Sequence, residues 1–126
     1  MELLKITRRP PVLARPENIV SEAAALMAQE GVGAVVVVNA EKQVQGIFTL
    51  RDKLLRVTFR RRDPDTMRLS EVMSTPVRTV SPEMTGNEGL NLMIRNRLRH
   101  LPIVDKANHV VAIASLFYPA VHRIGE

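Results

Sequence analysis

The pattern of apolar and polar residues predicts a run of secondary structure that occurs twice along the chain. Residues 16–31 have apolar side chains at the i, i+3, i+4 spacing of a helix, and Gly31 is expected to end it. Residues 32–39, VGAVVVVN, are β-branched and apolar at successive positions, which is typical of a strand covered on both faces. A polar turn, a second strand at 44–48 and a second helix from about Leu50 are expected to follow.

The same order of elements recurs when the sequence is shifted by 66 residues. Thr85 and Glu88 have the spacing of a capping box at the start of a helix. Strands are then expected at 99–105 and 110–114, and a second helix from about Leu116. The identical pairs include Pro16 and Pro82, Glu22 and Glu88, Leu26 and Leu92, Met27 and Met93, Val38 and Val104, Ile47 and Ile113, and Leu50 and Leu116.

Each copy is therefore expected to form a β-α-β-β-α unit, and a unit of this size leaves one face of its sheet uncovered. We predict an α+β fold in which two β-α-β-β-α repeats pack through their sheets with pseudo-twofold symmetry. The first repeat is expected in residues 1–61, and the linker and second repeat in residues 62–126, together forming one compact module. Residues 60–70, which are polar and contain Pro64, predict the connection between the copies.

Composition sets limits on the core and on the chemistry. The chain has 126 residues, of which 45% are hydrophobic, but only three Phe, one Tyr and no Trp, so its core is expected to be aliphatic. The absence of cysteine excludes disulfides and thiolate metal sites. No stretch approaches 18 apolar residues and the N-terminal segment does not read as a signal peptide, so we expect a cytoplasmic protein with no membrane partner.

The net charge of +5 and the cluster Arg60–Arg62 suit an anionic partner, or equally a solvated surface. A nucleic-acid-binding protein is one alternative. It is less favoured because no aromatic residues alternate with the basic ones, as a platform for single strands requires. No metal-binding spacing links the three histidines, and no nucleophile and base are paired, so neither a metal site nor an enzyme is predicted.

The candidate chemistry lies in GIFTLRD, residues 46–52. Thr49 and Asp52 have the spacing of a capping box, which contributes about 0.5–2 kcal/mol and needs no ligand. The same residues stand where a strand is expected to turn into a helix, and a carboxylate there can accept two hydrogen bonds from a vicinal diol. Gly46 would allow a ligand or a backbone to approach closely. Together these are the parts of a ribose-phosphate site.

With these motifs in place, the double unit resembles a tandem pair of CBS domains, the regulatory module named after cystathionine β-synthase and also called a Bateman module. GIFTLRDKLLRV is similar to the family signature G-h-x-T-x-x-D, where h is apolar, and residues 69–105 are similar to the opening of the second repeat. The resemblance extends from about residue 5 to 124. It implies a ligand cleft between the repeats, a regulatory and not a catalytic role, and stacking of modules into a disc-shaped dimer.

The resemblance also implies the ligand and the residues that bind it. The expected ligand is AMP, ADP or ATP, with NAD and S-adenosylmethionine as alternatives, and no cofactor is obligatory. Asp52 matches the residue that binds ribose, and Thr49 matches the hydroxyl that contacts ribose or phosphate. Arg51 lies between them and can reach a phosphate, and Ile47 belongs to the same signature. A homodimer and a separate effector protein are the expected partners.

The other repeat would complete this cleft with residues of its first strand and of the strand at 99–105. The resemblance implies that Val77, Leu101 and Pro102 flank the adenine, and that Arg78 and His100 face the phosphate. The remaining residue of this set is Thr79.

The second cleft departs from the family pattern. Ser115 keeps the hydroxyl, but Tyr118 stands in place of the aspartate, Ala112 in place of the glycine, and Leu13 in place of Thr79. We therefore predict that one cleft binds a nucleotide and that the other is silent or has another use. A dimerising module that binds no ligand is the remaining alternative.

Overall fold

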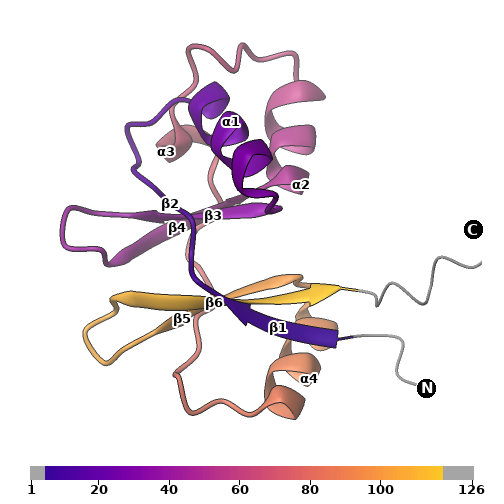
Figure 1. Cartoon of the computed structure of the whole chain (residues 1–126). Helices are drawn as coiled ribbons and strands as arrows, with labels where there is room; N and C mark the ends of the chain where they lie inside the picture. The colour runs from indigo at the N-terminus through magenta and orange to yellow at the C-terminus, as the bar shows by residue number, and fades with distance from the viewer. Residues whose placement is uncertain (1–4, 118–126) are drawn as a thin grey trace, which may run out of the picture.

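The computed structural model describes residues 5–117, which form two small β-sheets with helices on their outer sides (Figure 1). The helices α1, α2 and α3 cover the first sheet, and α4 covers the second. The elements in chain order are β1 (Lys5–Arg9), β2 (Leu13–Ala14), α1 (Val20–Glu30), β3 (Ala34–Val38), β4 (Val44–Thr49), α2 (Leu50–Asp52), the π-helical segment η1 (Lys53–Thr58), α3 (Leu69–Val72), α4 (Gly86–Asn96), β5 (His100–Val104) and β6 (Val110–Phe117).

Each sheet is completed by a segment that leads into the other repeat. The first sheet has the order β2-β3-β4, and the second β1-β6-β5. Strand β1 lies at the start of the first repeat but pairs antiparallel with β6 of the second. Reciprocally, Ser74 lies near the start of the second repeat but bridges to Ile47 in β4, and the chain then crosses to the second sheet, where Val80 bridges to Ile103. The two repeats are therefore interlocked by their lead-in segments, residues 5–9 and 73–75.

The 66-residue repeat extends to local irregularities of the backbone. A register shift between Val37 and Val38 in the first hairpin has its counterpart between Ile103 and Val104 in the second. The turns that follow contain the equivalent residues Lys42 and Asn108, both with positive φ. These matches confirm the prediction of two repeated β-α-β-β units in an α+β fold.

The helix ends follow the local signals in the sequence. Gly31 has φ 66° and ends α1, as predicted. The capping box of α4 is formed, because the Thr85 N–H donates to Glu88 Oε1 at 2.8 Å and the Glu88 N–H donates to Thr85 Oγ1 at 3.1 Å. The cap of α4 that is equivalent to Gly31 is Arg97, which adopts the same left-handed conformation with φ 55°.

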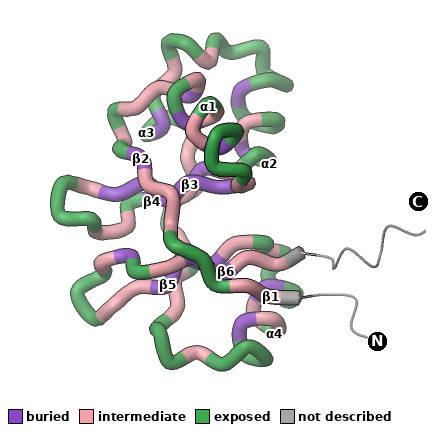
Figure 2. The backbone as a smooth tube through the Cα atoms, viewed as in Figure 1, coloured by how far each residue is buried: buried purple, intermediate pink, exposed green. Residues whose placement is uncertain are grey.

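Three apolar clusters form the core, and one of them joins the two sheets. It contains Ala34, Val36 and Val38 of β3 together with Val110 and Ile113 of β6. The other two clusters lie between each sheet and its own helices. All five residues of β3 are buried because the strand is covered on both faces, as its sequence predicted (Figure 2).

The expectation of a second helix beginning at about Leu116 is wrong at its start, because β6 continues through Leu116 to Phe117. Pairing with β1 explains the extra length: Ile6 is the partner of Leu116 in the ladder. Ser115 therefore lies inside a strand, between Thr7 and His100 on its two neighbours. Tyr118, on which the predicted loss of the second cleft depends, lies outside the described residues.

Candidate functional site

The site begins where β4 turns into α2. Thr49 ends the strand and is the N-cap of the helix, with φ −113° and ψ 168°. Its main-chain N–H donates to Asp52 Oδ2 at 3.0 Å, and its Oγ1 accepts from the Asp52 N–H at 3.0 Å. The capping box proposed from the sequence is therefore formed, and it holds one carboxylate oxygen of Asp52 at the junction.

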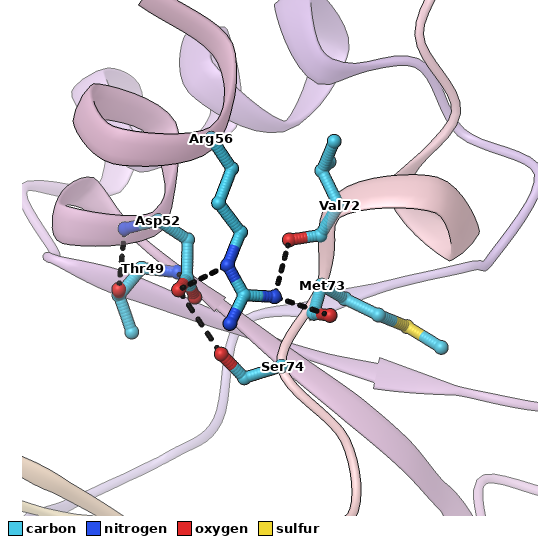
Figure 3. Close-up of polar contacts among 6 residues, drawn as sticks. All are labelled: Thr49, Asp52, Arg56, Val72, Met73 and Ser74. Carbon is cyan, nitrogen blue, oxygen red and sulfur yellow. Dashed lines mark hydrogen bonds and ion pairs between the residues drawn. The ribbon is translucent and has the colours of Figure 1, made fainter. Parts of the chain in front are cut away.

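The other carboxylate oxygen of Asp52 has partners from outside the motif (Figure 3). Ser74 Oγ donates to Asp52 Oδ1 at 3.0 Å, and Arg56 Nε lies 3.8 Å from the same oxygen. Asp52 is only 8% exposed and is the only buried charged residue in the described part of the chain. Burial of a charge is costly without such partners, so this carboxylate is held by a dedicated set of contacts.

These partners also fix the lead-in segment of the second repeat. Arg56 Nη1 donates to the carbonyl oxygens of Val72 at 3.3 Å and Met73 at 3.0 Å. Ser74 and Ile47 exchange two main-chain hydrogen bonds, at 3.1 and 2.8 Å. Gly46 makes room for this contact, because a β carbon there would lie 2.5 Å from Met73 Sδ. The glycine of the motif thus permits the close approach of the chain, one of the two uses predicted for it.

The predicted residues of the second repeat reach the same edge of the molecule by two routes. Residues 77–79 connect Ser74, bonded to β4, with Val80, whose N–H donates to the carbonyl of Pro102 at 3.1 Å. His100 of β5 lies against Gly33, since a β carbon on that glycine would be 3.5 Å from His100 Nε2.

His100 is also close to the start of α2. The carbonyl of Gly33 accepts a hydrogen bond from the Leu50 N–H at 3.0 Å, so Gly33 lies between the histidine and the helix. Burial, with a smaller contribution from the positive charge of Arg99, lowers the pKa of His100 from its ordinary value of 6.5. The imidazole is therefore neutral at pH 7.

The predicted residues of the second repeat differ in how far they are buried. Leu101 and Pro102 are both buried, Leu101 in the cluster with Met93 of α4. The alternation of a strand places Leu101 on the face opposite His100 and Pro102. Arg51 and Arg78 are exposed, and Val77 and Thr79 are half-buried.

Sequence reasoning missed Ser74 and Arg56. Arg56 lies four residues after Asp52, the helical spacing at which ion pairs form, and this signal was available. Ser74 had no such signal, because its contact with Asp52 joins residues 22 apart through the sheet edge.

Two surface hollows lie elsewhere. One of about 560 Å³ lies beside α4 and another of about 370 Å³ beside α1, and their linings correspond at the 66-residue shift, for example Glu88 with Glu22. Within residues 5–117, no group of three or more potential metal ligands is present. The same part of the chain contains no helix that is long and apolar enough to cross a membrane.

Comparison with known proteins agrees with this geometry. The family model of the CBS domain matches the chain twice, at residues 4–52 and 69–117. The CBS domain-containing protein YhcV of Bacillus subtilis is 40% identical over 109 residues, covering 86% of this chain and 76% of YhcV. The CBS domain protein PAE2072 of Pyrobaculum aerophilum, solved in complex with AMP, has a TM-score of 0.77 at 27% identity, covering 85% of this chain and 81% of that one.

The two interlocked repeats define a tandem domain pair, and the chain belongs to the CBS-domain family, as its sequence predicted. Another relative, the protein MK0525 of Methanopyrus kandleri, is 34% identical over 112 residues. The match covers 89% of this chain but only 57% of MK0525, so the chain spans little more than half of that relative.

Proposed function

We propose that the chain is a regulatory module that binds an adenosine nucleotide, AMP, ADP or ATP, beside Asp52 and signals its presence to a separate effector protein in the cytoplasm. The observation that carries this proposal is the Asp52 carboxylate, fixed at a strand–helix junction beside the segment that crosses between the repeats. The AMP complex of the related PAE2072 supports an adenosine ligand. A carboxylate has acceptor capacity for the two hydroxyls of a ribose in addition to its internal partners.

The neighbouring residues have roles that follow from their positions. Thr49 and the exposed Arg51 lie on either side of Leu50, next to Asp52, and would contact ribose or phosphate. Val77, Leu101 and Pro102 would flank the adenine. Arg78 would meet the phosphate as a cation, whereas His100 would meet it as a neutral hydrogen-bond donor, because its pKa is lowered.

Thermal unfolding with AMP, ADP, ATP, NAD and S-adenosylmethionine tests the proposal. A ligand at 100 times its dissociation constant stabilises the folded state by about 2.7 kcal/mol. For a domain of this size, that raises the unfolding midpoint by roughly 5–15 °C. Asp52→Asn should lose this shift, because an amide retains one acceptor oxygen for Thr49 but cannot accept both ribose hydroxyls.

Glu88→Gln is the matched control, because Glu88 occupies the equivalent place in the capping box of α4 and is not part of the proposed site. It should keep the full ligand shift. A wild-type protein that is stabilised by none of the nucleotides would contradict the proposal and leave Thr49 and Asp52 as a helix cap alone.

We also propose that the module acts as a homodimer. Four large apolar side chains of α2, η1 and the residue after them are exposed: Leu50 by 55%, Leu54 by 59%, Leu55 by 45% and Phe59 by 80%. Exposed apolar surface of this kind is typical of an interface. Sedimentation velocity should give twice the chain mass for the wild type and a monomer for Leu54→Glu, and a monomeric wild type would contradict a dimer.

A further inference from the structure

The Asp52 carboxylate is held on one side by Thr49 of the family signature and on the other by Ser74 and Arg56, which the signature does not contain. Thr49 N–H donates to Oδ2, whereas Ser74 Oγ donates to Oδ1, each at 3.0 Å. With both oxygens bonded, the side chain is confined to one rotamer and the carboxylate plane is fixed. Arg56 adds a positive charge 3.8 Å from Oδ1.

Neither partner is free to move away. Ser74 is anchored by its two main-chain hydrogen bonds with Ile47. The Arg56 guanidinium is anchored by the carbonyls of Val72 and Met73. These contacts join the helix after β4 to the end of α3, as Figure 3 shows. The groups that hold the carboxylate are thus themselves held by the fold, the condition for a preorganised binding group.

The residue of the other repeat that is equivalent to Ser74 has a different role. Residue 8, which precedes Ser74 by 66 positions, is an arginine whose guanidinium donates to the carbonyls of Pro82, at 3.1 Å, and Met84. It offers no hydroxyl to the second cleft. Within the described residues, the hydroxyl that orients a carboxylate therefore occurs only beside Asp52.

We propose that Ser74 and Arg56 are positioning residues that aim the Asp52 carboxylate at the ribose diol, and so set the preference of the site for ribonucleotides over deoxyribonucleotides. This inference rests on the proposed nucleotide site. A hydrogen bond from a ligand hydroxyl to a charged group, lost on deletion of that hydroxyl, corresponds to about a ten- to hundredfold difference in affinity. Such discrimination requires a carboxylate in one orientation.

Isothermal titration with AMP and 2′-deoxy-AMP tests this directly. The wild type should bind AMP about ten- to a hundredfold more tightly than 2′-deoxy-AMP. In Ser74→Ala this ratio should fall to within about threefold, through weaker AMP binding. Ser74→Thr, which retains the hydroxyl, should restore the ratio, and Ser81→Ala, an exposed serine outside the site, should leave it unchanged.

Arg56→Met is the second variant, and it should also lower the ratio while the unliganded protein remains folded in a thermal scan. A Ser74→Ala protein with an unchanged ratio overturns the inference and leaves the nucleotide site intact. A Ser74→Ala protein that binds AMP more tightly also overturns it, because Ser74 would then compete with the ligand. A wild type that binds neither nucleotide overturns the proposed function as well.

Discussion

Replacement of Gly46 by alanine tests whether the motif glycine serves the contact with the lead-in segment of the second repeat. A β carbon at Gly46 would lie 2.5 Å from Sδ and 2.9 Å from Cγ of Met73, and 3.1 Å from the carbonyl oxygen of Ser74. The first two distances are shorter than a side-chain carbon tolerates. Either the Met73 side chain or the main chain at 73–74 has to move.

Both movements disturb existing contacts. Met73 packs against the buried cluster of the first repeat, and Ser74 is bonded to Ile47 through both its N–H and its carbonyl. Overpacking of this kind costs about 1–3 kcal/mol. For a chain of this length, that lowers the unfolding midpoint by roughly 3–15 °C.

Thermal unfolding followed by circular dichroism measures the effect, and two other glycines provide controls. At Gly89 the nearest atoms are the flexible end of Met84, Cε at 2.8 Å and Sδ at 3.0 Å, so Gly89→Ala should cost less. At Gly33 the nearest atom is 3.5 Å away, an ordinary contact, so Gly33→Ala should unfold near the wild-type temperature. If Gly46→Ala unfolded at the same temperature as Gly33→Ala, the reasoning would be refuted.

Three further predictions concern the core, a helix end and acid stability. Phe48→Ala removes a side chain with 0% exposure and should lower the free energy of unfolding by about 3–5 kcal/mol in urea titrations, against about 0.5 kcal/mol or less for most surface changes. Gly31→Ala places a β carbon on a residue with φ 66° and should lower the free energy of unfolding by about 1–2 kcal/mol in the same assay. An unchanged free energy of unfolding would show that the turn relaxes and would contradict this prediction. Because the pKa of His100 is lowered in the folded state, the unfolded chain takes up a proton first as the pH falls through 6.5. The contribution of His100 to the free energy of unfolding is therefore fully present above pH 6.5 and declines below it. Thermal scans between about pH 5 and 8 should show a shallower decline for His100→Gln, and an identical decline would contradict this origin.

Much of the fold could be predicted because its signals are local. Gly31 ends α1, Thr85 and Glu88 cap α4, and the apolar run in β3 is buried on both faces. Each of these outcomes depends on residues within a few positions of one another, where spacing alone decides which groups meet. Thr49 and Asp52 were found for the same reason.

One error arose where distant segments meet. The length of β6 was missed because it depends on pairing with β1, more than a hundred residues earlier in the chain.

By itself, then, the sequence determined the two repeats, the ends of their main helices, the buried strand and the Thr49–Asp52 junction, because short-range geometry specifies them. Only the tertiary structure decided which sheet receives each lead-in segment, and therefore that Ser74 and Arg56 hold the Asp52 carboxylate. The physical reason is that an open sheet edge offers the same row of N–H and C=O groups to any strand. Which segment binds there is settled by the packing of the whole molecule.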